Sequence, residues 1–139
     1  AIGPFIRLFD QHFSLNDVRE TQIEIEVRSA DRFNMSGVSD LKKISRDIAD
    51  LVGQTINKHH QYPDGLMLFL GTMFAPIQDR GAPGQGFTHK LGDIVTIRAP
   101  RLGTLVNRVN HTDKIPPWNF GSQALFRNLA ERGLLANNR

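Results

Sequence analysis

A short alternating segment is the strongest constraint on how this chain folds. In residues 21–27 the apolar side chains Ile23, Ile25 and Val27 alternate with polar ones. This period of two is typical of a strand that is buried on one face, because successive strand side chains point to opposite sides of a sheet. A turn at Asp31-Arg32 and a short return strand over residues 33–35 then predict a hairpin.

The hydrophobic period changes after this hairpin. From Ser39, apolar residues recur every three or four positions as far as Ile56, which predicts one amphipathic helix with its N-cap at Ser39 or Asp40. We expect a second helix over residues 121–132, with Leu125, Leu129 and Phe126 facing inward and Gly133 ending it.

Further strands and loops follow from apolar runs and turn residues. Residues 1–9 are expected to form a turn and an extended, largely buried segment, and the unbroken apolar run 66–70 predicts a strand buried on both faces. The proline- and glycine-rich residues 76–86 indicate a loop long enough to be functional. Two more strands are expected at 94–98 and 102–109. Residues 1–139 are therefore expected to form a single α+β domain.

Composition excludes several classes of protein. The 139 residues include no cysteine, which rules out disulfides, thiolate metal sites and a cysteine nucleophile, and which is compatible with the cytoplasm. No apolar stretch approaches the roughly 20 residues of a membrane helix. The formal charge is only +3 and the arginines are scattered, so we expect no nucleic-acid partner; retention on heparin and DNA would test this weaker alternative.

A few residues are candidates for chemistry. Glu24 and Glu26 share one strand face and could bind a divalent cation, or else form a solvated outer face. His59 and His60 are adjacent and would reach one ion only from irregular backbone, so an exposed helix end is the simpler interpretation. Gly71-Thr72 ends the apolar run with N–H groups and a hydroxyl, which suit a carboxylate ligand but also a plain strand-ending turn.

The order of the motifs resembles the C-terminal portion of the fumarylacetoacetate hydrolase (FAH) family over nearly the whole chain. The motifs are, in order, Gly3-Pro4-Phe5, the helix with Ser39 and Arg46, Pro63-Asp64-Gly65, Gly71-Thr72, Gly92-Asp93 and residues 102–107. The loop 76–86 and the tail 117–121 are most similar to the sugar-acid branch, whose members act on 2-keto-3-deoxy acids.

The resemblance implies a mixed β-sandwich roll with two flanking helices, usually dimeric, and a Mg²⁺-dependent hydrolase or lyase that acts on 2-keto or 2,4-diketo acids. In the family the cation polarises the ketoacid and the threonine of the Gly-Thr motif helps to hold the substrate carboxylate. The resemblance thus assigns substrate binding to Thr72, with Gly71 permitting close approach.

The chain departs from the family in one respect. The family's metal-binding carboxylates and active-site lysine precede the Gly-Pro element, whereas here Gly3-Pro4 lies at the start and Glu24-x-Glu26 follows it. We therefore expect Glu24 and Glu26 not to be the metal ligands, the chain to be part of a larger catalytic domain, and the missing groups to come from an upstream half. The alternative is a non-catalytic module that works by self-association or through a partner protein.

Overall fold

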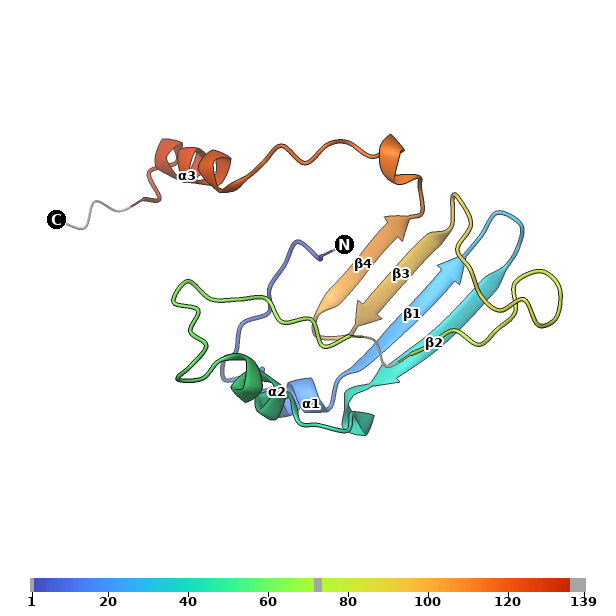
Figure 1. Cartoon of the computed structure of the whole chain (residues 1–139), viewed down its shortest axis with the longest axis horizontal. Coiled ribbons are helices and arrows are strands. Elements are labelled where there is room, and N and C mark those ends of the chain that lie inside the picture. The colour runs from blue at the N-terminus through green and yellow to red at the C-terminus, as the bar shows by residue number, and fades with distance from the viewer. Residues whose placement is uncertain (1, 72–73, 136–139) are drawn as a thin grey trace. The chain divides into compact units, whose positions relative to one another are not determined.

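The computed structural model describes residues 2–71 and 74–135. The chain divides into two compact units, Ala1–Val109 and Asn110–Arg139. The first unit holds one sheet (Figure 1), built from β1 (Gln22–Arg28), β2 (Asn34–Asp40), β3 (Ile94–Ala99) and β4 (Gly103–Arg108). That residues 1–139 form a single domain stays a prediction.

The sheet consists of two hairpins joined by a long-range pair. Its strand order is β2-β1-β3-β4 and every neighbouring pair is antiparallel. The structure therefore confirms the expected first hairpin, the two strands expected at 94–98 and 102–109 and the α+β class, although β2 is longer than the return strand expected from the sequence. The mixed sandwich roll of the FAH family stays a prediction.

The two faces of the sheet differ in polarity as the alternation predicts. Val27 pairs with Met35 on β2 and with Val95 on β3, and Val27 and Met35 are buried. Ile23 and Ile25 share this apolar face but are only half-buried. Glu24 and Glu26 lie on the opposite face, so the core sits on the Val27 side of the sheet.

The helix expected from Ser39 to Ile56 is wrong in its first half. Residues 34–40 form β2, Leu41–Lys43 form the short 3₁₀ helix η1, and only Ile48–Thr55 form the α-helix α2. Asp40 accepts a hydrogen bond from the Lys42 amide at 3.0 Å and Asp47 accepts one from the Ala49 amide at 2.9 Å. Because each aspartate caps a new helix start, they divide the periodic segment into two short helices.

Two segments expected to be buried are exposed. Residues 66–70 form no strand, and Met67 and Phe69 are 63% and 70% exposed. Within 1–9, Phe5 is 86% exposed. Both expectations are wrong for the described residues, because none of the four strands pairs with either segment and a strand needs a neighbour for its backbone groups.

A short helix that the sequence analysis missed lies between these N-terminal residues and β1. α1 (Leu15–Arg19) begins with a capping box, in which the Ser14 amide and hydroxyl both donate to the Asp17 carboxylate at 2.8 Å. The Ser-x-x-Asp pattern of residues 14–17 in the sequence could have indicated this helix start. Arg19 of α1 then pairs with the Asp47 cap of α2, with Nε and Oδ2 2.6 Å apart.

The second unit contains the 3₁₀ helix η2 (Thr112–Lys114) and the helix α3 (Ser122–Glu131). The predicted C-terminal helix is confirmed, and Gly133 follows it with the positive φ of 66° that favours glycine at a helix end. The expected inward face is wrong: no residue of α3 is buried, and Leu125 and Phe126 are 43% and 59% exposed. No described helix is long and apolar enough to span a membrane.

Candidate functional site

Gly71 lies on the wall of a cavity of about 560 Å³ in the first unit. It is exposed and has a backbone φ of 81°, which residues other than glycine rarely adopt. Thr72, which the family resemblance assigns to the same role, lies outside the described residues. The structure thus places one of the two predicted substrate-binding residues in a hollow, here called the Gly71 cavity.

The Gly71 cavity has an apolar part and a basic part. Its polar side chains are Lys43, Ser45 and Arg46, from the end of η1 and the turn before α2. The other lining residues are apolar or glycine: Ile23, Leu41, Ile44, Leu51, Leu70 and Gly71. Lys43 and Ser45 were not singled out by sequence reasoning, because only the turn between two short helices brings them to the same hollow.

The basic side chains of the Gly71 cavity are partly uncompensated. Arg46 donates from Nε to Asp50 at 2.7 Å and is about half exposed. Within the described part of the chain, no carboxylate lies within ion-pair distance of Lys43. One free cation, one paired cation and a hydroxyl beside apolar side chains suit a small organic anion.

The Asp47 cap at the start of α2 is held in its charged form. The Arg19 guanidinium, followed by the Ala49 amide, lowers the pKa of Asp47 to about 2. Asp47 therefore stays ionised at neutral pH and keeps both the start of α2 and its contact with α1. The charged Asp47 cap therefore helps to hold the turn that contains Ser45 and Arg46, next to the buried Ile48.

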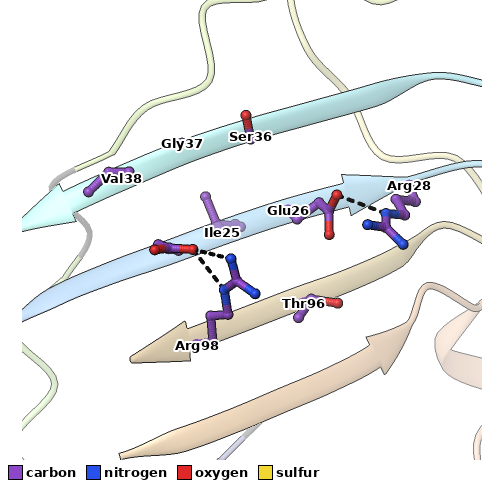
Figure 2. Close-up of a pocket in the computed structure, with 9 residues that line it drawn as sticks. Ile25, Glu26, Arg28, Ser36, Gly37, Val38, Thr96 and Arg98 are labelled. Carbon is purple, nitrogen blue, oxygen red and sulfur yellow. Dashed lines mark hydrogen bonds and ion pairs between the residues drawn. The ribbon is translucent and has the colours of Figure 1, made fainter. Parts of the chain in front are cut away.

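Glu24 and Glu26 lie on the charged face of the sheet, over an open hollow of about 440 Å³ (Figure 2). Arg98 pairs with Glu24 across the strands, donating from Nε at 2.7 Å, and Arg28 donates to Glu26 at 2.8 Å. Arg28 follows Glu26 by two residues on the same strand, but the sequence does not show the contact of Arg98 with Glu24, which the β1–β3 register creates.

The described residues do not fit a resident Mg²⁺ ion. Glu24 and Glu26 are engaged by arginines, and no group of three His, Asp or Glu side chains in the described part of the chain could hold a metal. His59 and His60 lie in an exposed turn closed by an Asn57–His60 bridge.

A buried ion pair anchors the loop 76–86. The side chains of Arg80 and Asp93 are 1% and 0% exposed. Nη1 of Arg80 donates to Oδ2 of Asp93, and Nη2 donates to Oδ1 at 2.9 Å. The Arg80 guanidinium also donates to the Thr88 carbonyl at 3.1 Å and lies over the Phe33 ring. Because Arg80 is so close, the pKa of Asp93 is held well below its usual range. The sequence indicated a loop here, but not the buried pair.

The comparisons with known proteins give no relative. No protein-family model, no curated protein and no solved structure matches the chain.

Proposed function

We propose that this chain binds the carboxylate of a 2-keto or 2,4-diketo acid in the Gly71 cavity, as the substrate-holding part of a metal-dependent hydrolase or lyase of the FAH type. The observation that supports this proposal is the meeting of Gly71 with Lys43, Ser45 and Arg46 around one hollow. The motif order of the sequence supports the FAH family as its context.

The roles within the proposed site follow from the chemistry of the lining. Lys43 and Arg46 attract the carboxylate, and the apolar side chains of Leu41, Leu51 and Leu70 accommodate the carbon chain. The Mg²⁺ that the family uses would be bound by groups outside the described residues. A cytoplasmic location is part of the same proposal, and the cysteine-free sequence is compatible with it.

Titration with 2-oxobutanoate, followed by the NMR shift of the Gly71 amide, tests the proposal. Lys43→Met should weaken binding about fivefold, or about 1 kcal/mol, because an exposed charge contributes little more than that. Lys42→Met is the matched control: Lys42 is its neighbour but pairs with Glu20 and does not line the cavity.

Two results would contradict this function. Equal loss of affinity in Lys42→Met and Lys43→Met would show a general charge effect instead of a site. Equally tight binding of 2-butanone, which has the ketone without the carboxylate, would exclude carboxylate recognition.

We also propose a second function, a non-catalytic module that acts by self-association. The exposed apolar segment 66–70 favours it, since Met67 and Phe69 are more than 60% exposed and monomeric proteins rarely expose such clusters. Light scattering across a concentration series should then give a mass above 15.6 kDa, and Phe69→Ser should lower it. A monomer at every concentration would contradict self-association.

A further inference from the structure

The segment that follows Thr72 is fastened at two points to β2 and at a third to Asp93, the residue before β3. Phe74 packs on Gly37 in the middle of β2, and Gln78 donates to the carbonyl of Asn34, at the start of β2, at 3.3 Å. Arg80 then enters the buried pair with Asp93. Figure 1 shows this segment running beside β2, in the direction opposite to the strand.

The contact between Phe74 and Gly37 requires glycine. A Cβ built at position 37 would overlap the Cε and Cζ atoms of the Phe74 ring. Gly37 has an ordinary strand position, paired with Ile25, and no positive φ that would call for glycine. Glycine in a strand interior costs backbone entropy, so its presence here is explained by the close approach of the ring.

The far end of the segment is held more rigidly than its length suggests. The Asp79 carboxylate accepts hydrogen bonds from the Gly84 and Gly86 amides at 2.7 and 2.6 Å, and the Arg80 amide donates to the Gly86 carbonyl at 2.9 Å. These bonds close the loop on itself, while Arg80 fixes it to Asp93. The loop 76–86 is therefore an anchor rather than a free lid.

The Phe74 contact joins the two walls of the Gly71 cavity. One wall, with Leu41, Lys43 and Arg46, continues directly from β2, the strand that carries Gly37. The other wall is formed by Leu70 and Gly71, and Gly71 lies three residues before Phe74. Three Cα steps of 3.8 Å allow Gly71 at most about 11 Å from Phe74. Packing of Phe74 on β2 thus limits how far the walls can separate.

We propose that Phe74 and Gly37 are positioning residues for the carboxylate site, with Gln78 and Arg80 as the anchor that keeps the ring in place. The positioning role rests on the proposed function of the Gly71 cavity. The fastening of residues 74–78 to β2 does not rest on it, and it can be measured separately.

The test compares five variants of the whole chain: Phe74→Ala, Gly37→Ala, Phe74→Leu, Val38→Ala and the double variant Gly37→Ala/Phe74→Ala. Val38 is the control, because it neighbours Gly37 but points to the other face of β2 and is 54% exposed. Backbone ¹⁵N relaxation reports the order of residues 74–78, and 2-oxobutanoate titration reports the site. Phe74→Ala and Gly37→Ala should loosen the segment and weaken binding about three- to tenfold, the cost of ordering a freed segment.

The remaining variants should behave differently. Phe74→Leu should retain most of the affinity for 2-oxobutanoate, because leucine keeps an apolar side chain over Gly37. Val38→Ala should change neither the relaxation data nor the affinity. The double variant Gly37→Ala/Phe74→Ala should lose as much 2-oxobutanoate affinity as Phe74→Ala alone, because both substitutions disrupt the same contact.

Each other outcome has a distinct meaning. Unchanged order of residues 74–78 in Phe74→Ala and Gly37→Ala would overturn the fastening itself. A loosened segment with unchanged 2-oxobutanoate affinity would overturn the positioning role. Absence of 2-oxobutanoate binding in the unaltered chain would overturn the proposed function and with it the positioning role, while the relaxation data would still decide whether Phe74 is fastened to β2.

Discussion

At the scale of single residues, the Arg80–Asp93 pair is the most deeply buried charged contact of the described residues. It links three turns, since Asp93 also accepts from the Lys90 amide at 2.9 Å and Asp31 lies 3.7 Å from Arg80. Removing one partner leaves the other charge buried alone, which costs far more than the intact pair contributes.

Asp93→Asn and Arg80→Met are therefore expected to lower the free energy of unfolding by about 3–5 kcal/mol in urea titrations. Arg98→Met is the control: its pair with Glu24 is exposed, so the loss should stay within about 1 kcal/mol. Equal effects of Arg80→Met and Arg98→Met would contradict the importance of burial.

Acid sensitivity is also a property of individual carboxylates. Lys90 and Arg19 lower the pKa values of Asp31 and Asp47, respectively, to about 2. Because these pKa values are depressed in the folded chain, the stabilisation is present above the ordinary value of about 3.9 and is lost as the pH falls towards about 2. The urea midpoint should fall across this window.

The charge change itself must be separated from this effect. Asp47→Asn should reduce the fall of the urea midpoint between about pH 4 and pH 2, because it removes one titrating contact. Asp64→Asn, an equal charge change in an exposed turn, should leave the fall unchanged. The same pH dependence in both variants would contradict the role of the Arg19–Asp47 pair.

At the scale of elements, the sequence of α2 contains a residue that lowers the stability of the helix. It has eight residues, begins at the Asp47 cap and contains Gly53, where an added Cβ would meet nothing within 4 Å. Glycine in a helix interior carries an entropic cost that alanine does not.

Gly53→Ala should therefore raise the free energy of unfolding by about 0.5–1 kcal/mol. Gly65→Ala is the matched comparison: space is open there too, but the φ of 87° disfavours any side chain, so this change should destabilise. A thermal or urea melt distinguishes the two signs, and a loss of stability in Gly53→Ala would contradict the helical backbone at this position.

At the scale of the whole molecule, all strand pairs of the four-stranded sheet lie within the first unit. β4 ends at Arg108, and the Gly92 amide donates to the Val109 carbonyl at 2.9 Å, the last contact of the β3–β4 hairpin region. None of the four strands lies in Asn110–Arg139. The second unit is thus not required for the strand order.

A chain that ends after Asn110 is expected to keep the exchange protection of the β1 and β3 amides, because every strand pair survives the cut. Hydrogen exchange followed by NMR measures this directly. A chain that ends after Gly103 is the control; it loses β4 and should lose protection along β3. Unprotected β1 amides in the longer chain would contradict an independent first unit.

How far the sequence predicts this molecule depends on the range of the interactions. Alternation around Val27 predicted β1 and its buried face, since each residue reports its own side of the strand. Residues 66–70 misled, because an apolar run records only that a segment prefers burial, not whether a partner strand exists. The helix from Ser39 failed for a local reason: the capping carboxylates of Asp40 and Asp47 outweighed the hydrophobic period.

The sequence by itself determined the first hairpin, the two later strands, the C-terminal helix and the loop 76–86, all of which depend on residues close together in the chain. Tertiary structure alone decided the pairing of β1 with β3, the burial of Arg80 beside Asp93, the fit of Phe74 on Gly37 and the gathering of Lys43 and Arg46 around Gly71. These contacts join residues far apart in the chain, and local propensity contains no record of which distant partner lowers the free energy most.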